Sequence, residues 1–288
     1  MKKFLFYAIM VLAVMACSDQ NAPTNARNGA LPGKFSVSAT KQVQFAQGNL
    51  QYQPSSNTWR FAEHQYDLIL DDNTYISRSY TGWIDLFGWG TGDNPLNVST
   101  TKADYTYFVD WGMNPISNGG NTAHTWSTLT DLEWLYLFHD RTNADKLFGF
   151  GTVKGIKGVI LLPDDWSASG IMGFTPTPLS WDVHNYQPSS VLTWNGTSYV
   201  IVEKGDDFTL NTYTTEEWTQ MESMGAVFLP MSGYRLGLNL YETTNQGSYW
   251  SAKPKDSGYG YCLYFTYSNL YPYTALSRSA GCCVRLVK

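Results

Sequence analysis

Three cysteines in the C-terminal part of the chain, Cys262, Cys282 and Cys283, are the side chains best suited to covalent chemistry. Paired cysteines can oxidise a substrate thiol, and a thiolate with a low pKa can act as a nucleophile. Cys282 and Cys283 are neighbours, however, so on a strand their side chains point to opposite faces. No basic or histidine partner that would lower a thiol pKa is evident beside them. We therefore expect no catalysis from these cysteines, and a disulfide between Cys262 and one of the other two stays open.

Metal and phosphate chemistry are not indicated either. The four histidines are scattered, and no Cys-x-x-Cys or Cys/His cluster suggests zinc. The glycine-rich segment "GWGTGDNP" lacks the Lys-Ser/Thr ending of a phosphate loop. Two acidic pairs, Asp164–Asp165 and Asp206–Asp207, could hold calcium, although such pairs in loops are usually only solvated. The sequence therefore predicts no cofactor and no metal site.

The C-terminal stretch, Gly258–Lys288, is suited to noncovalent binding. It reads "GYGYCLYFTYSNLYPYTALSRSAGCCVRLVK" and contains six tyrosines and no acidic residue. Leu263 and Phe265 alternate with their neighbours, so one set should face the core and the other the solvent. The alternation is lost over Tyr271–Ala280, which predicts an ordered loop. Tyrosine offers rigid contact area and a hydroxyl at low entropic cost, so we predict a binding surface. The alternative is that these tyrosines only cover the core of a chain that is 16% aromatic.

Short strands must position these residues. Between residues 34 and 63 apolar side chains recur at every second position, as at Val43 and Phe45, with breaks at Gly48-Asn49 and "PSSN". This pattern predicts a meander of short strands. "GVILLPDDW", "AVFLPMSGYRLG" and "GSYWSA" are further strand candidates, and "SVLTWNGTSYVIVEKG" predicts a hairpin around Asn195-Gly196.

Two helices are expected among these strands. Thr130 is followed three residues later by Glu133, a capping-box pattern that predicts a helix start. The apolar residues expected on the buried face of this helix are Leu132, Leu135 and Phe138. A second helix should begin at Thr214 or Thr215 and stop at Gly225. Two helices among many short, irregular strands predict an α+β fold.

The N-terminus predicts export and lipidation. Lys2 and Lys3 precede the apolar run "FLFYAIMVLAVMA", which is too short to span a bilayer and suits a secretory signal. The run ends in "VMAC", where a small residue directly precedes Cys17, as at the processing site of bacterial lipoproteins. We predict a signal peptide over residues 1–16, a lipidated Cys17, a flexible polar tether over 17–33 and one ligand-binding domain over 34–288. The alternative is an ordinary signal peptide with a chance cysteine.

The charge of the chain bears on its partners. The formal net charge is -5, and removal of Lys2 and Lys3 with the signal peptide would make it more negative by two units. An acidic chain of this kind is a poor candidate for binding nucleic acid. We expect contact with a membrane only through the lipid anchor.

Four motifs in one order, "WSTLTDLEWLYLF", "FLPMSGYR", "GSYWSA" and "GCCVRLVK", resemble a known family. The family is the bacterial form of the C-type lectin fold, shared by the formylglycine-generating enzyme superfamily and the variable proteins of diversity-generating retroelements. The opening "FSVSATKQVQFAQGNLQYQPSSNTWRFAE" is similar to surface lipoproteins of gut Bacteroidetes with this fold. The resemblance covers residues 34–288. It implies a C-type lectin-like fold whose termini meet in a sheet and whose last strands carry the ligand face, anchored in the outer membrane and exposed at the cell surface.

The resemblance also implies which residues bind. In the retroelement-linked members a C-terminal stretch is rewritten at chosen codons while scaffold residues stay fixed. The residues that match the scaffold are Tyr249, Trp250, Leu263, Phe265, Leu270, Pro272, Arg278, Gly281, Val284, Arg285 and Leu286. The implied ligand-binding residues between them are Lys255, Tyr259, Cys262, Tyr264, Thr266, Tyr267, Tyr271, Tyr273, Thr274, Leu276, Ser279 and Cys282. Cys283 departs from the small hydroxyl residue expected at its position.

The function predicted from these features is non-catalytic binding of a protein or glycan on another cell, a phage or a host surface. Three alternatives stay open. The sister enzymes of this fold oxidise a peptide cysteine with a spaced cysteine pair and a metal, whereas Cys282 and Cys283 are adjacent. Lectins of this fold commonly hold calcium through Glu-Pro-Asn and Trp-Asn-Asp, which are absent here, so sugar binding would be calcium-independent. The third alternative is a structural component of a surface or fimbrial assembly.

Overall fold

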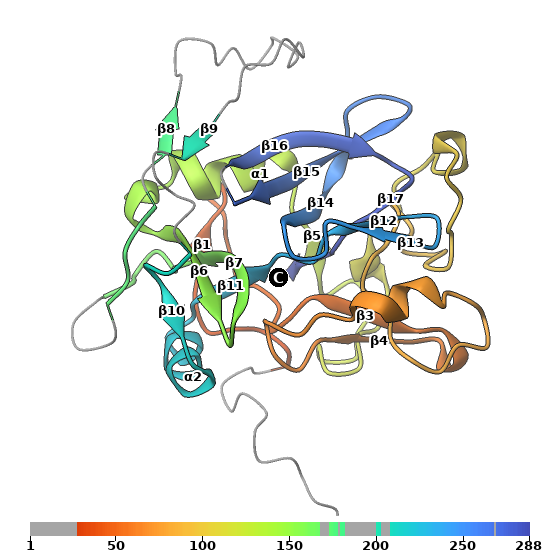
Figure 1. Cartoon of the computed structure of the whole chain (residues 1–288), viewed down its shortest axis with the longest axis horizontal. Coiled ribbons are helices and arrows are strands. Elements are labelled where there is room, and N and C mark those ends of the chain that lie inside the picture. The colour runs from red at the N-terminus through yellow and green to blue at the C-terminus, as the bar shows by residue number, and fades with distance from the viewer. Residues whose placement is uncertain (1–27, 168–172, 178, 182–199, 203–207, 268) are drawn as a thin grey trace, which may run out of the picture.

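The computed structural model describes residues 28–167, 173–177, 179–181, 200–202, 208–267 and 269–288. The predicted signal peptide, Cys17, most of the predicted tether, the Asp206–Asp207 pair and the predicted turn at Asn195-Gly196 lie outside these residues. The described chain has a mixed α+β structure with many short strands and few helices, as predicted (Figure 1). None of its helices is long and apolar enough to cross a membrane.

The strands form several small sheets. The largest has the order β10–β6–β7–β11, made of Thr212–Tyr213, Phe148–Val153, Ile156–Leu161 and Val227–Pro230. A second has the order β13–β12–β17, made of Asn239–Tyr241, Tyr234–Leu236 and Ala280–Gly281. A third has the order β14–β15–β16, made of Gln246–Pro254, Tyr259–Thr266 and Leu270–Ser277.

The remaining strands pair two by two. These pairs are β1 with β2 (Phe35–Ser36, Gln42–Val43), β3 with β4 (Leu50–Gln53, Thr58–Phe61), β5 with β18 (Ser127–Thr128, Leu286–Val287) and β8 with β9 (Leu179–Trp181, Val200–Val202). The predicted meander between residues 34 and 63 therefore exists as the two pairs β1–β2 and β3–β4. Its apolar positions, including Val43 and Phe45, are buried.

The two predicted helices are both present. Helix α1, Asp131–Leu135, continues into a π-helical turn η5, Tyr136–Asp140, and α2 covers Thr215–Ser223. Short 3-10 turns occur at η1 (Pro54–Ser56), η2 (Leu70–Thr74), η3 (Lys102–Asp104), η4 (Trp111–Met113) and η6 (Ala144–Lys146). Helix α2 ends at Ser223 with Met224 as its C-cap, and the next residue, Gly225, has φ of +94°, a conformation that favours glycine.

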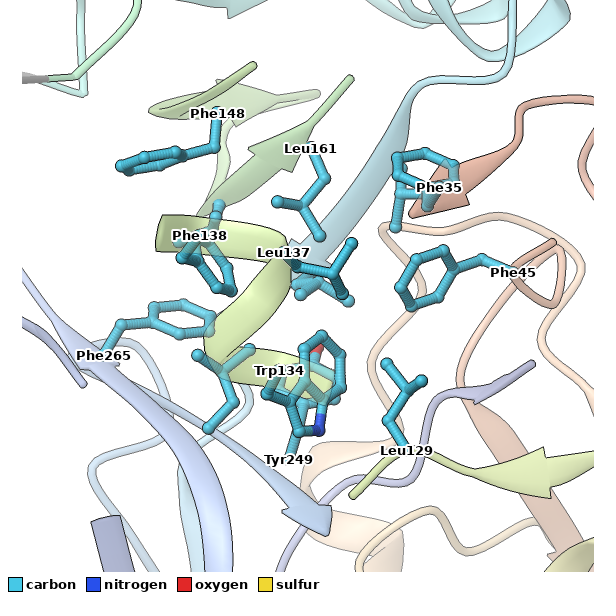
Figure 2. Close-up of a cluster of buried hydrophobic side chains, with 14 of the residues drawn as sticks. Phe35, Phe45, Leu129, Trp134, Leu137, Phe138, Phe148, Leu161, Tyr249 and Phe265 are labelled. Carbon is cyan, nitrogen blue, oxygen red and sulfur yellow. The ribbon is translucent and has the colours of Figure 1, made fainter. Parts of the chain in front are cut away.

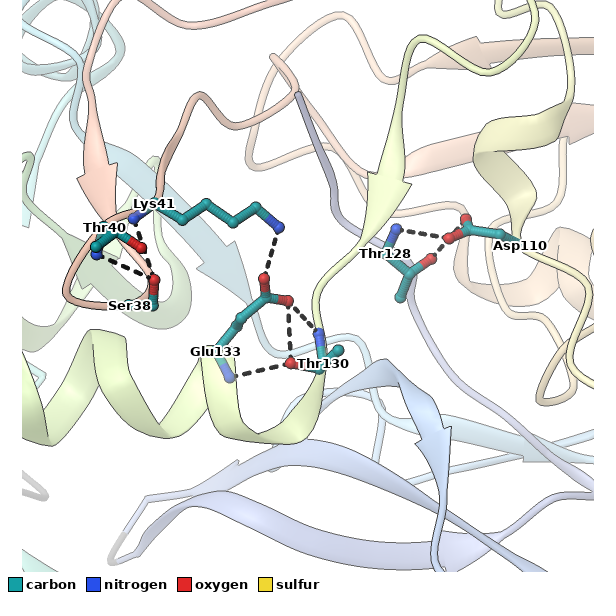
Figure 3. A network of polar contacts seen from close by, with 7 residues as sticks. All are labelled: Ser38, Thr40, Lys41, Asp110, Thr128, Thr130 and Glu133. Carbon is teal, nitrogen blue, oxygen red and sulfur yellow. Dashed lines mark hydrogen bonds and ion pairs between the residues drawn. The ribbon is translucent and has the colours of Figure 1, made fainter.

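A capping box fixes the start of each helix. The Thr130 hydroxyl accepts a hydrogen bond from the backbone of Glu133 at 3.2 Å, and the Glu133 carboxylate accepts one from the Thr130 backbone at 2.7 Å. Lys41 adds an ion pair to the same carboxylate at 2.6 Å, which ties α1 to the β1–β2 turn (Figure 3). Thr214 and Glu217 repeat this arrangement in α2, so Thr214 is the N-cap.

The predicted buried face of α1 is partly wrong. Leu135 and Phe138 are buried as expected, but Leu132 is 58% exposed. Trp134 and Leu137 lie in the core instead. The buried positions Asp131, Trp134, Leu135 and Phe138 follow the regular helical spacing i, i+3, i+4, i+7. A strict spacing of three residues drifts around the helix, which is why Leu132 falls outside the buried face.

The core consists of separate hydrophobic clusters. The first surrounds α1 and contains Phe35, Phe45, Trp134, Phe148 and Phe265 among others (Figure 2). A second cluster under β3, β4 and the tryptophan-rich loop includes Trp59, Phe87, Trp89, Trp111 and Trp250. A third packs α2 against the β6–β7–β11 sheet. The extended segment that joins β17 to β18 lies between the first two clusters, because Cys282 contributes to the second and Cys283 to the first.

The two ends of the described chain meet. Residues 286–288 exchange backbone hydrogen bonds with residues 44–46, including Ala46 to Leu286 at 2.9 Å and Gln44 to Lys288 at 2.8 Å. Ala30 bridges to Ala46, and both Ala30 and Leu31 are buried. The segment over residues 28–33, expected to belong to the tether, thus packs on the domain.

The C-terminal sheet differs from its predicted form at one strand. Residues 270–277 form β16 rather than part of a loop, and they pair with β15 in antiparallel register. The register shifts between Cys262 and Tyr264, where β16 holds an additional residue. Such an irregularity interrupts the alternation of a strand, which is why the period of two was lost in the sequence.

Candidate ligand-binding surface

The residues expected to form a fixed scaffold are all buried. They are Tyr249, Trp250, Leu263, Phe265, Leu270, Pro272, Arg278, Gly281, Val284, Arg285 and Leu286. Tyr249 and Leu263 are opposite each other in β14 and β15 and enter the first cluster, while Trp250 and Cys262 are opposite each other and enter the second. Sheet β14–β15–β16 therefore has an apolar contact on each of its two faces.

Tyr264 and Tyr271 form a cross-strand pair in this sheet. They lie directly opposite each other in β15 and β16, with ring centroids 5.9 Å apart, and both side chains are half-buried. Tyr264 packs on the cluster that contains Trp250 and Cys262. Burial raises the pKa of both phenols, so both hydroxyls stay neutral and able to donate or accept a hydrogen bond.

A hairpin outside the predicted residues extends this pair. Tyr234 of β12 and Tyr241 of β13 are register partners with stacked rings, 5.3 Å between centroids. Tyr234 packs on the same hydrophobic cluster as Tyr264, and the Glu242 carboxylate adds to the effect of burial in raising the pKa of Tyr264. We call the surface made of Tyr234, Tyr241, Tyr264 and Tyr271 the tyrosine face.

Sequence reasoning missed the two hairpin tyrosines. The segment "GYRLGLNLYE" carries the signal that could have found them. Gly237 lies between two short alternating runs, and the tyrosines stand at the two ends that are farthest from this glycine. Gly237 has φ of +62°, which a tight hairpin turn requires. Register then places Tyr234 and Tyr241 on one face.

Tyr273 lies on the other side of the sheet from the tyrosine face. Its ring stacks on Tyr261 with 4.5 Å between centroids, and the Tyr273 hydroxyl donates to the Tyr261 hydroxyl at 3.0 Å. Alternation along β15 places Tyr261 on the same side as Leu263 and Phe265. The residues predicted as one patch are therefore divided between two faces of one sheet.

Other predicted binding residues lie at the ends of the strands. Tyr259 is exposed at the start of β15, and the Lys102 ammonium lies 3.7 Å from its ring centroid. Tyr267 is 57% exposed at the turn between β15 and β16. The side chains of four more predicted residues are partly exposed, namely Lys255, Thr266, Thr274 and Leu276.

Three predicted binding residues are corrected by the structure. Cys262 and Cys282 are fully buried and Ser279 is 1% exposed. Cys262 points into the cluster with Trp250, and Cys282 lies in the same cluster beneath Tyr234. The Ser279 hydroxyl shares a hydrogen bond with Ser277 at 2.8 Å. All three side chains therefore lie beneath the surface rather than on it.

The cysteines are free thiols in an apolar environment. Cys262, Cys282 and Cys283 are unpaired with one another, so the disulfide left open by the sequence is not formed. Burial raises the pKa of all three thiols, which disfavours the thiolate. Cys283 takes the place of the expected hydroxyl residue by donating to Ser232 at 3.0 Å and accepting from Asn49 at 3.3 Å.

The acidic pair Asp164–Asp165 has another role. The Asp164 carboxylate accepts hydrogen bonds from the backbone and hydroxyl of Ser36, both at 2.7 Å, and from Gln42 at 2.9 Å, and it pairs with Arg141 at 3.3 Å. It therefore joins the β1–β2 segment to the β7 end of the chain. Within the described ranges no group of three or more histidine, cysteine or acidic side chains could hold a metal ion.

The chain was compared with family models, curated proteins and solved structures. No family model, no curated protein and no solved structure matches the chain.

Proposed function

We propose that this chain is a non-catalytic binding protein of the bacterial surface, with a C-type lectin-like fold of the retroelement variable-protein type. It would bind a macromolecular ligand on another cell, a phage or a host surface through its C-terminal strands. The observation that supports this most is the Tyr264–Tyr271 pair, two partly exposed aromatic side chains in contact across two strands. Their neighbours in sequence, Leu263, Phe265, Leu270 and Pro272, are all buried.

Buried side chains lie next to partly exposed ones along β15. This arrangement would allow the surface residues to change while the fold is kept. Leu263 and Phe265 are fully buried, whereas Tyr264 between them is only half-buried. The free energy of folding depends on the buried side chains, so the partly exposed positions are comparatively free in identity. This property is what a diversified binding surface needs.

Two further features are consistent with the proposed fold. The last strand pairs with the first described segments, since residues 286–288 bond to residues 44–46. The strands β14, β15 and β16 lie together as one sheet in the upper part of the view in Figure 1. Lipidation at Cys17 would attach the domain to the outer membrane through the N-terminal segment.

The double variant Tyr264→Ala, Tyr271→Ala tests the proposal. The mature protein is immobilised and the retention of intact gut bacteria, phage particles and arrayed glycans is measured. We expect the double variant to lose retention of whatever target the parent protein captures. Tyr107→Ala is the matched control, because Tyr107 is 81% exposed in a loop and its ring is not part of the tyrosine face.

If the folded double variant retains the target as well as the parent protein does, the proposal is wrong. Retention of one class of arrayed sugar, and nothing else, would instead support the calcium-independent lectin. Sequencing the gene in sibling strains gives an independent test. Substitutions should gather at positions such as Tyr264, Tyr271 and Thr274 and spare Trp250 and Phe265.

A further inference from the structure

The tyrosine face carries a carboxylate at its border. Glu242 directly follows Tyr241 at the end of β13 and is exposed, and its charge contributes to the raised pKa of both Tyr234 and Tyr264. Its side chain accepts only a long hydrogen bond, 3.4 Å, from the Asn245 amide. The Glu242 carboxylate therefore borders the stacked Tyr234–Tyr241 pair, and no basic side chain in the described part of the chain forms an ion pair with it.

The closest basic side chain in the hairpin does not neutralise this charge. Arg235 is fully buried on the opposite side of β12 from Tyr234. Its guanidinium donates to the carbonyls of Leu86 at 2.7 Å, Asn97 at 3.0 Å and Gly237 at 3.1 Å. These bonds direct the cation inward and leave Glu242 as the charge that faces solvent.

We infer that the tyrosine face binds a cationic segment of a protein partner, with a lysine or arginine side chain between the aromatic rings and Glu242. Aromatic faces attract ammonium and guanidinium groups, and charge complementarity steers a partner to its surface. The chain itself makes this kind of contact at the other end of β15, where Lys102 lies over Tyr259 at 3.7 Å. The inference rests on the proposed function and specifies the chemistry of its ligand.

Fluorescein-labelled peptides of equal length test this inference on the whole mature protein. One peptide carries spaced lysines, the second carries acetyl-lysine at the same positions, and the third carries glutamate. Binding is followed by fluorescence anisotropy at low and at moderate salt. We expect binding of the lysine peptide, weakening as salt increases, and a loss of roughly two- to thirtyfold on acetylation, the range of a cation–aromatic contact.

Two matched charge variants locate the contact. Glu242→Gln removes the border carboxylate, and Glu216→Gln removes an exposed carboxylate of α2, which lies away from the tyrosine face (Figure 1). Only Glu242→Gln should weaken binding of the lysine peptide. Tyr241→Leu, which keeps apolar bulk in an exposed side chain, should weaken it as well, with circular dichroism confirming that each variant is folded.

Equal effects of the two glutamate variants, or equal binding of the lysine and acetyl-lysine peptides, would overturn the inference. Its failure is separable from failure of the proposed function. If cells or phage are captured through Tyr264 and Tyr271 but capture is indifferent to Glu242→Gln and to salt, the binding function stands and the cationic partner is wrong.

Discussion

Neighbouring side chains of β15 differ in burial: some pack in the core, and others are partly exposed at the surface. Phe265 is fully buried and stacks on Tyr249 with 6.1 Å between centroids. Its neighbour Tyr264 is half-buried and meets Tyr271 at the surface. Sequence alternation identified Phe265 as core, but it could not show that Cys262 is equally buried, because both faces of this sheet pack on apolar clusters.

Phe265→Ala should destabilise the fold strongly. The substitution leaves a cavity between the first cluster and β14, with a cost of about 3–5 kcal/mol in the free energy of unfolding. Urea unfolding followed by tryptophan fluorescence measures this difference. The double variant Tyr264→Ala, Tyr271→Ala should cost much less, since both rings are partly solvated. A comparable loss in the two proteins would mean that the tyrosines belong to the core.

Glu222→Gln should change the pH dependence of stability. Burial raises the pKa of Glu222 to about 7, while Gln65 and Arg285 oppose the shift. The folded state therefore holds a proton that the unfolded state has released between pH 4.5 and about 7, so stability falls as pH rises through this window. We expect Glu222→Gln, which keeps a partner for the Gln65 side chain, to abolish the part of this fall that Glu222 contributes.

Unfolding free energies at the two ends of the window check this expectation. Glu216→Gln, at an exposed position of the same helix, is the control and should retain the pH dependence of the parent protein. Asp85 has a raised pKa of about 6 for the same reason, burial, so part of the fall should persist in Glu222→Gln. An unchanged profile in Glu222→Gln would contradict the assignment.

Among the elements, the helix starts were the most predictable features. Thr130 with Glu133 and Thr214 with Glu217 are local signals, and each pair forms the expected reciprocal hydrogen bonds. Strand β16 was not predictable, because an irregular register beside Tyr264 removes its alternation. The position of the β12–β13 hairpin beside the candidate surface depends on tertiary packing. A local sequence pattern does not predict such packing.

Thr214→Ala should weaken α2 without changing its position. The variant loses the hydroxyl that accepts from the Glu217 backbone at 3.2 Å, and an N-cap of this kind contributes about 1 kcal/mol. Thr214→Ser keeps the acceptor and should retain most of the stability. Thermal unfolding of the three proteins separates these outcomes, and equal melting temperatures would show that the cap contributes nothing.

For the whole molecule, the sequence gives the α+β class but not the division of the predicted patch. Tyr264 and Tyr273 were expected on one surface, yet the irregular register sends them to opposite faces of sheet β14–β15–β16. The length of the tether was also misjudged. Ala30 and Leu31 pack on the domain because small and apolar side chains in that segment fit beside Ala46 and Phe45.

Cys17→Ser should release the protein from the membrane if Cys17 is the lipidated residue. The variant lacks the thiol that would carry the acyl chains, so it should appear in the soluble fraction and incorporate no labelled palmitate. The part of the chain from residue 28 onward should fold as before, with the melting temperature of the parent protein. Membrane association that survives the change would show that another feature anchors the chain.

The hydrogen bonds between residues 286–288 and residues 44–46 impose an order on biogenesis. The first strands leave the ribosome long before their pairing partners in residues 286–288 have been synthesised. These strands stay unpaired, and therefore prone to aggregation, until nearly the whole polypeptide has been synthesised. A nonsense codon ahead of residue 286 would thus remove these hydrogen bonds together with the buried Leu286 and Val287, and a purification handle is better placed ahead of residue 28 than after Lys288.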